Sequence, residues 1–401
     1  MINKSLIERL FTAFSIERWN DQIRPTPLVE MDKHAHKMAI AYCLARSDED
    51  TKRKRLRGLV WHNIIRGGIF ELLRRCVLSD IKSPIYREIK SQHPDHFKKL
   101  SKWVFQQLEP EVGQGEICNE MKRYLVKDNL LDERSKRILE AAHIYASHWE
   151  FQIISRTTPD GEEAQQISNA TVLQLAQYEK LPGMGDILER DPPAAFLDVL
   201  GKLRFQIRWG QTPRMPRTSV LGHSMMVASL AYLMTREVRS PRACNRRLRN
   251  NFFGGLFHDL PEAVTRDIIS PVKGAVPGLS RIIGRMEKKL VREIIYPLLD
   301  PKWIKEFRYF TEDEFMCKII RRGKIIKLGS SDISRENNKD HFQPYDGRLI
   351  EAADHLAGLA EAKMSGIQTT ELQKGAIQLG GKHKNERIAG VDIGSIFANW
   401  N

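Results

Sequence analysis

Long apolar runs are absent from this chain of 401 residues. No stretch approaches the roughly 18 consecutive apolar residues from which a membrane-spanning helix is built, so we expect no membrane segment. The first residues, MINKSLIERLFTAF, carry charges inside their apolar pattern and are followed by no small-residue cleavage site. They therefore do not have the pattern of a secretory signal. The sequence predicts a cytoplasmic protein.

Cysteine is scarce and scattered. The chain has five cysteines, an odd number, and no two of them have CxxC spacing. This usage argues against a disulfide scaffold and is typical of reduced thiols in a cytoplasmic protein. The five are Cys43, Cys76, Cys118, Cys244 and Cys317.

Alternating strand patterns are also scarce, and apolar residues recur at three- and four-residue steps through most of the chain. Such periodicity is typical of amphipathic helices. The sequence therefore predicts an all-α protein with at most a minor hairpin. The predicted helices include residues 59–78, 223–238, 312–328 and 347–364.

Acidic residues are outnumbered by basic ones. The chain has 64 Lys and Arg against 50 Asp and Glu, a formal net charge of +14, which favours anionic partners such as nucleotides, RNA or DNA. Basic residues concentrate at 51–57, 240–249 and 319–327, but no aromatic-interleaved RNA motif or zinc finger accompanies them. We favour solvated basic faces over a dedicated nucleic-acid groove and keep the groove as the alternative.

The candidate metal-binding and catalytic residues centre on a His-Asp doublet, His258-Asp259, which follows an apolar segment. Glu262 comes one turn later, His223 opens the apolar run SMMVASLAYLM, and Asp354 lies within RLIEAADHLAGLAEAKM. Neutral imidazoles and carboxylates are the ligands that divalent transition metals take from proteins. The alternative is a set of histidines that pack in the core without a metal.

Four segments of the N-terminal half match four of the C-terminal half in the same order. The matches are KHAHKMAIAYCLA (33–45) with GHSMMVASLAYLM (222–234), GLVWHN (58–63) with GGLFHD (254–259), LSDIKSPI (78–85) with TRDIISPV (265–272), and LEAAHIYASHWE (139–150) with IEAADHLAGLAE (350–361). Ordered matches of this kind indicate a repeated structural unit. We predict two copies of one helical domain, residues 1–155 and 170–401, joined by a polar linker at 156–169.

The order His…His-Asp…Asp, with a Glu four residues after the His of the doublet, resembles the HD superfamily of metal-dependent phosphohydrolases. Three further motifs indicate a subgroup of this superfamily: the dipeptide RW at 208–209, the RT at 217–218 and the run TRDIISPVK at 265–273. Together they are similar to the HD-domain 5′-deoxynucleotidases, the YfbR-like group. The resemblance covers about residues 195–365.

The resemblance implies a role for each matching residue. Glu262 would transfer the proton, and Asp267 would support substrate or water. The ion would be Mn, Co, Fe, Ni or Zn, with Mg as the alternative. The implied metal ligands are His223, His258, Asp259 and Asp354, and the implied substrate-binding residues are Arg208 at the phosphate, Trp209 beside the sugar, Arg217 and Lys273.

The N-terminal copy departs from this pattern. Asn63 stands where the doublet has Asp, His143 stands where the last Asp is expected, and no Glu lies four residues after His62. The remaining set, His34, His62, Asn63 and His143, has less negative charge to hold a cation. We favour a degenerate copy that packs like the second subunit of the family's dimers, forming an internal pseudo-dimer, over a different metal site.

Two classes of function remain in competition. The first is an enzyme that hydrolyses a nucleotide phosphoester, most simply a nucleoside 5′-monophosphate, with cyclic nucleotides and alarmones as variants. The second is a nuclease for single strands or a regulatory protein that uses the pocket to sense a nucleotide. A polar segment at 330–347 is a candidate lid in either case.

Overall fold

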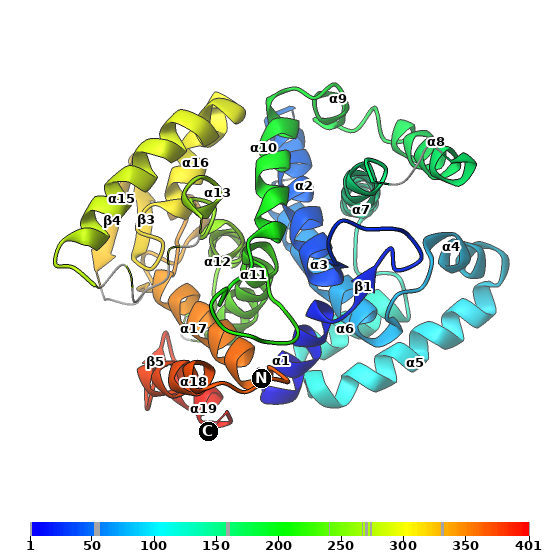
Figure 1. Ribbon diagram of the computed structural model, residues 1–401. Coiled ribbons are helices and arrows are strands. Elements are labelled where there is room, and N and C mark those ends of the chain that lie inside the picture. Colours follow the sequence, from blue (N-terminus) through cyan, green and yellow to red (C-terminus); the bar gives the residue numbers. More distant parts are fainter. Residues whose placement is uncertain are drawn as a thin grey trace. The chain divides into compact units, whose positions relative to one another are not determined.

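The structure is a computed structural model that describes residues 2–51, 57–157, 161–239, 241–266, 268, 272, 275–329 and 333–400. Helices dominate it and the strands are short, which confirms the predicted all-α class (Figure 1). The chain divides into two compact units, Met1–Pro182 and Gly183–Asn401. None of the described helices has both the length and the apolar character needed to cross a membrane.

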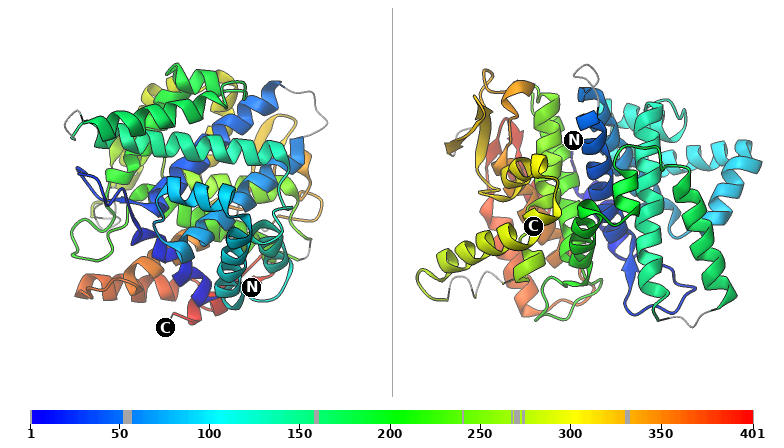
Figure 2. Two further views of the ribbon diagram at one scale, coloured as in Figure 1. Left: turned by 90° about the vertical axis from the view of Figure 1, so that its right-hand side faces the viewer. Right: turned by 90° about the horizontal axis from the view of Figure 1, so that it is seen from above.

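In the first unit, helix α2 packs against α7 and α3, and α8 packs against α7 (Figure 2). Nearly the whole length of α2 is buried, up to Ala45. The elements are α1 (Lys4–Phe11), η1 (Thr12–Phe14), β1 (Glu17–Arg18), β2 (Leu28–Val29), α2 (Glu30–Thr51), α3 (Arg57–Leu78), α4 (Ser83–Gln92), α5 (Pro94–Val112), α6 (Glu116–Leu125), α7 (Glu133–Ile154) and α8 (Glu162–Ala176).

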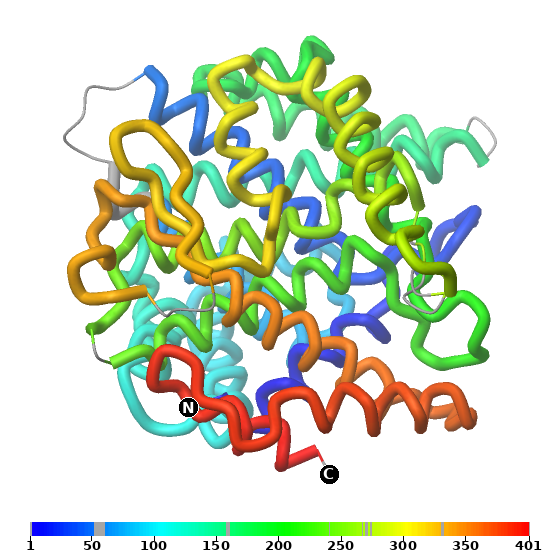
Figure 3. Tube along the Cα trace, turned by 90° about the vertical axis from the view of Figure 1, so that its left-hand side faces the viewer, coloured from blue at the N-terminus to red at the C-terminus, as the bar shows by residue number. Residues whose placement is uncertain are grey.

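In the second unit, α11 packs against α12 and α17, and α18 lies along α17 (Figure 3). The helical elements are α9 (Met184–Leu188), α10 (Pro192–Gly201), η3 (Lys202–Phe205), α11 (Val220–Glu237), α12 (Asn245–Phe257), α13 (Glu262–Thr265), α15 (Leu279–Leu290), the π turn η4 (Val291–Ile295), η5 (Tyr296–Leu298), α16 (Pro301–Thr311), η6 (Asp340–Phe342), α17 (Gly347–Lys363), α18 (Thr370–Lys382) and α19 (Ile393–Ala398). The strands are β3 (Cys317–Arg321) with β4 (Lys324–Gly329), and β5 (Arg387–Ile388) with β6 (Val391–Asp392).

Helix α11 is the buried axis of this unit. Its N-cap Ser219 accepts a hydrogen bond from the Gly222 amide, and every residue from Val220 to Arg236 is buried. A Cβ at Gly255 of α12 would lie 2.9 Å from Ala228 Cα of α11. Glycine therefore allows the two backbones to approach closely. This approach brings the start of α11 and the end of α12 together, where His223 and His258 lie.

The helix predicted at residues 312–328 is wrong, because much of this segment forms the antiparallel hairpin β3–β4. Arg322 and Gly323 have φ values of 48° and 75°, as a two-residue hairpin turn requires. Ile319 pairs with Ile326, and Ile320 with Ile325. Adjacent isoleucines fit helical and strand periodicity alike, so the apolar pattern could not separate the two. Their β-branched side chains favour the strand.

The segment predicted as a linker, 156–169, is partly helical, since α8 begins at Glu162. Ala164 and Ile167 pack against a cluster that includes Phe151 and Ile154 of α7. This apolar contact holds the start of α8 to the first unit. The boundary between the units falls later, between Pro182 and Gly183.

Candidate metal centre

Two histidines approach each other in the second unit, and each has its Nδ1 atom against a fixed acceptor. His258, at the end of α12, has Nδ1 2.8 Å from the carbonyl oxygen of Gly255. His223, in the first turn of α11, has Nδ1 3.1 Å from Oε1 of Glu361. An imidazole that donates from Nδ1 presents the lone pair of Nε2. Both rings are therefore set to bind an ion through Nε2.

Two carboxylates lie close to these Nε2 atoms. Asp259 Oδ2 lies 3.2 Å from His258 Nε2, and Asp354 Oδ1 of α17 lies 2.8 Å from His223 Nε2 and 3.9 Å from His258 Nε2. One ligand atom each from His223, His258 and Asp259 falls within 4.8 Å of the others. An ion bound at about 2.1 Å from each donor holds its ligand atoms within roughly 4 Å of one another. Small side-chain adjustments therefore close this set on one divalent ion.

The charges of the cluster are strongly coupled. Burial alone would lower the pKa of His258, but the adjacent Asp259 carboxylate and that of Asp354 raise the pKa to about 9. Burial alone would raise the pKa of Asp354, but its hydrogen bond to His223 and the charges of both histidines hold that pKa well below its ordinary value. A proton and a metal ion compete for the same Nε2 lone pairs. The donor set therefore suits a cation.

Glu361 is a buried anchor that the sequence reasoning missed. Its side chain is 1% exposed, and its Oε2 accepts hydrogen bonds from Arg208 Nε at 3.2 Å and Trp209 Nε1 at 2.9 Å. Arg214 is also buried, with Nη1 3.8 Å from the same oxygen. Two signals were available: Glu361 follows Asp354 by two helical turns, which places both on one face of α17, and it aligns with Glu150 in the repeat.

Arg208 and Trp209, which were predicted to bind substrate, lie next to the cluster. Arg208 Nη1 lies 3.7 Å from Asp259 Oδ2. The carboxylates of Glu361, Asp259 and Asp354 raise the pKa of Arg208 above its ordinary value, although burial opposes them. The Trp209 ring lies over Gly375 of α18, where a Cβ would come within 2.7 Å of it. The guanidinium is thus near the predicted ligands, while Glu361 and α18 hold the indole.

A cavity of about 360 Å³ adjoins the His-Asp doublet, and Glu262 lies in its wall together with His258 and Asp259. Residues of α15 and residues 311–316 also line the cavity. Glu314 lies close enough to His258 and Asp259 for their charges to act on it, and burial raises its pKa. Glu314 belongs to no recognisable sequence motif, so only the folded structure shows that its carboxylate lies at this cavity.

Among the remaining predicted residues, those that the structure describes lie outside this cluster. Arg217 is exposed on the loop before α11, and none of the contacts above includes it. Asp267 and Lys273 fall outside the described residues. In the first unit, His34 lies on α2, His62 and Asn63 on α3, and His143 on α7. Across the described ranges, the one group with metal-ligand geometry is that of His223, His258 and Asp259.

Comparison with known families bears on the second unit. Residues 200–379 match the HD domain. The matched range includes all four predicted ligands of the centre described above. An HD domain indicates a metal-dependent phosphohydrolase in general. No curated protein and no solved structure matches the chain. The 5′-deoxynucleotidase subgroup and the tandem duplication stay predictions.

Proposed function

We propose that the HD domain hydrolyses a nucleoside 5′-monophosphate, deoxy or ribo, to the nucleoside and phosphate, with the aid of a divalent metal. The observation that carries this proposal is the convergence of two imidazole Nε2 atoms and two carboxylates beside a cavity. A phosphate monoester is an anion that repels hydroxide. A bound cation neutralises that charge and lowers the pKa of bound water.

The other residues of the centre complete the chemistry. Arg208, beside Asp259, offers a planar fork of N–H donors to two phosphate oxygens. Glu262, in the cavity wall, would take a proton from the attacking water or give one to the leaving oxygen. General acid–base help of this kind contributes about 10²–10⁴-fold.

The lining of the cavity supports a substrate with a single phosphate. Beyond the doublet, its residues that are charged at neutral pH are one base, Lys288, and five acids, namely Glu262, Glu287, Glu312, Asp313 and Glu314. Further phosphates would be repelled here, because like charges in a confined site disfavour each other. The hydroxyl and amine groups of a nucleoside are hydrogen-bond donors, for which carboxylates are good acceptors. The volume is also within the range of small-molecule sites.

The second candidate, a nuclease or nucleotide-sensing protein, draws support from the β3–β4 hairpin. Arg321, Arg322 and Lys324 are exposed at its turn and add to the net charge of +14. Binding through such residues would weaken steeply as salt is raised. The acidic cavity lining argues against a polynucleotide at the centre itself, so we rank this candidate second.

The test is phosphate release from nucleoside monophosphates, cyclic nucleotides and single-stranded oligonucleotides, each with Mn²⁺, Co²⁺ or Mg²⁺. We expect metal-dependent release from monophosphates that falls to background in His258→Ala/Asp259→Ala. The control is His96→Gln, an exposed histidine of the first unit, which should keep full activity. Cleavage of oligonucleotides with no release from monophosphates would overturn the proposal in favour of the nuclease. Metal binding without turnover of any of these substrates would favour the sensor.

A further inference from the structure

The contacts around Glu361 recur around Glu150, its aligned residue in the first unit. Glu150 Oε2 accepts hydrogen bonds from Arg18 Nε and Trp19 Nε1, both at 3.0 Å. These donors form an Arg-Trp dipeptide ahead of the first histidine, as Arg208 and Trp209 do. Both tryptophans have an unusual positive φ, 55° for Trp19 and 57° for Trp209. The two units thus hold their aligned glutamates with the same Arg-Trp pair. The partners of the aligned histidines differ, because His223 Nδ1 lies against Glu361 whereas His34 Nδ1 lies 3.1 Å from Glu30 Oε1.

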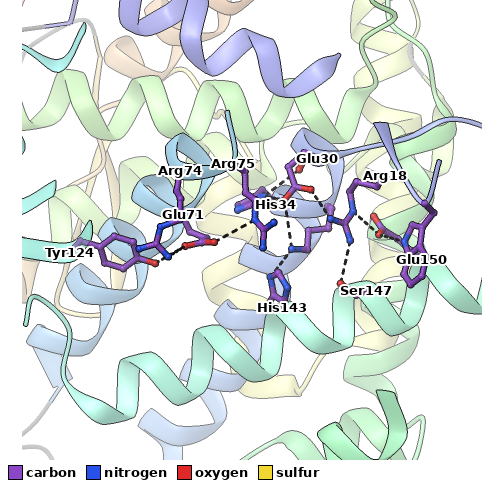
Figure 4. A network of polar contacts seen from close by, with 12 residues as sticks. Arg18, Glu30, His34, Glu71, Arg74, Arg75, Tyr124, His143, Ser147 and Glu150 are labelled. Carbon is purple, nitrogen blue, oxygen red and sulfur yellow. Dashed lines mark hydrogen bonds and ion pairs between the residues drawn. The ribbon is translucent and has the colours of Figure 1, made fainter. Parts of the chain in front are cut away.

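Where the HD domain gathers its ligands, the first unit contains a lysine. Lys33 aligns with Gly222, which has no side chain to extend toward the ligands. Lys33 is fully buried, and its Nζ lies 2.6 Å from His143 Nδ1 and 3.7 Å from Glu30 Oε1. Figure 4 shows these two partners, His143 and Glu30, within the polar network of the first unit. His143 aligns with Asp354, a predicted metal ligand. The amine therefore makes the contact that a metal ion would make with the residue at this position.

Other aligned positions are also committed to contacts within the protein. Asn63, aligned with Asp259, donates from Nδ2 to Asp132 at 2.7 Å and accepts from Arg66. Burial and the positive charges of Lys33, Lys37 and Arg75 keep the pKa of His143 well below its ordinary value, so these groups disfavour a further cation. His34 Nε2 is buried without a hydrogen-bond partner among the described residues. One such nitrogen does not make the three- or four-ligand set that a protein-bound metal needs.

We propose that the first unit is a metal-free counterpart of the HD centre, in which the Lys33 amine fills the place of the ion. This inference rests on the proposed metal site of the HD domain. The amine can fill the place with or without its extra proton, because it donates an N–H to His143 Nδ1 in either state. The first unit then keeps the fold around the centre but lacks the metal ion and the reaction that the ion would support.

Metal stoichiometry on the full chain tests the proposal. We expect one equivalent of tightly bound Mn²⁺ in the wild type and none in His258→Ala/Asp259→Ala, measured by elemental analysis after gel filtration and by electron paramagnetic resonance. Two equivalents in the wild type, or one retained in the double variant, would overturn this inference and leave the proposed function standing. No Mn²⁺ in the wild type would overturn both.

A matched pair of variants tests Lys33 itself. Lys33→Gly/Asn63→Asp/His143→Asp gives the first unit the aligned residues of the HD domain, and we expect a second equivalent of Mn²⁺. Asn63→Asp/His143→Asp keeps the lysine and should stay at one equivalent. A second equivalent in the variant that keeps Lys33 would show that the amine is not the obstacle. So would a single equivalent in the triple variant, if its circular dichroism matches the wild type.

Hydrogen exchange of the wild type gives a test that needs no folded variant. Removal of metal with EDTA should speed exchange in α11 and α17, which carry predicted ligands, and leave α2 and α7 unchanged. Faster exchange in α2 and α7, with α11 and α17 unaffected, would mean that the ion is bound in the first unit and would overturn the inference.

Discussion

At the scale of single residues, the centre depends on what lies behind each imidazole. A backbone carbonyl takes the Nδ1 proton of His258, whereas His223 relies on a side chain, Glu361. A carbonyl is fixed by the helix, but a carboxylate must itself be held. Arg208 and Trp209 hold the Glu361 carboxylate by donating hydrogen bonds to its other oxygen, Oε2. Glu361 therefore links the predicted phosphate-binding arginine to the orientation of a predicted metal ligand.

We predict that Glu361→Gln weakens Mn²⁺ binding by about 10–100-fold, the usual effect of removing an outer partner of a ligating histidine. The amide keeps one acceptor but turns an N–H₂ group toward donors that need an oxygen. Isothermal titration with Mn²⁺ measures the effect. Glu351→Gln, on the same helix, is the control and should bind like the wild type. An unchanged affinity in Glu361→Gln would show that His223 needs no such support.

The residues that sequence predicted best are those within contiguous motifs. His258 and Asp259 are neighbours in the chain, and Glu262 follows by one turn, so any fold that buries this segment keeps them together. Glu314 is different, because it reaches the same cavity from a distant segment whose local pattern has no recognisable chemistry. A side chain of this kind becomes a candidate only when the fold is known.

At the scale of elements, close approach of helices depends on glycine. Gly255 permits the contact of α12 with α11, and Gly375 makes room on α18 for the Trp209 ring. Apolar periodicity predicted the helices, including α11 and α17, because burial on a helical face imposes that period. It could not predict which helix meets which, and it failed for the β3–β4 hairpin, where a two-residue turn decides the structure.

We predict that Gly375→Ala displaces Trp209, because the new Cβ would lie 2.7 Å from the ring. Loss of the hydrogen bond between the indole and Glu361 should follow, with a shift in tryptophan fluorescence and weaker Mn²⁺ binding. Gly381→Ala on the same helix is the matched control, since a Cβ there meets nothing within 4 Å. This control should be neutral or more stable by up to about 1 kcal/mol, from helix propensity alone. Equal behaviour of the two variants would contradict the packing argument.

At the scale of the whole molecule, overall charge and local charge point in different directions. The chain carries +14, yet most of the charged residues that line the cavity beside the doublet are carboxylates. Composition predicts long-range attraction of anions, and only the fold reveals which charges face the substrate. The acidic residues of the cavity wall are spread over three segments of the chain, so their gathering could not be predicted from the sequence.

The first unit should be sensitive to acid through His34. Burial lowers the pKa of this imidazole from 6.5 to about 4. The folded state keeps His34 neutral, while the unfolded state binds a proton below pH 6.5. The contribution of His34 to the free energy of unfolding is therefore complete above pH 6.5 and is lost as the pH falls toward 4. A pKa shift of this size corresponds to about 3 kcal/mol of the free energy of unfolding. His143, whose pKa is also held well below its ordinary value, acts in the same direction.

Hydrogen exchange of α2 and α7 at pH 7 and pH 4.5, corrected for intrinsic rates and with EDTA present, measures this loss. His34→Gln cannot titrate, so it should lose less protection between the two pH values than the wild type does. His96→Gln removes an exposed histidine and should behave like the wild type. If His34→Gln loses as much protection as the wild type, burial of His34 in its neutral form is not a source of the acid sensitivity, and other buried groups of the unit must carry it.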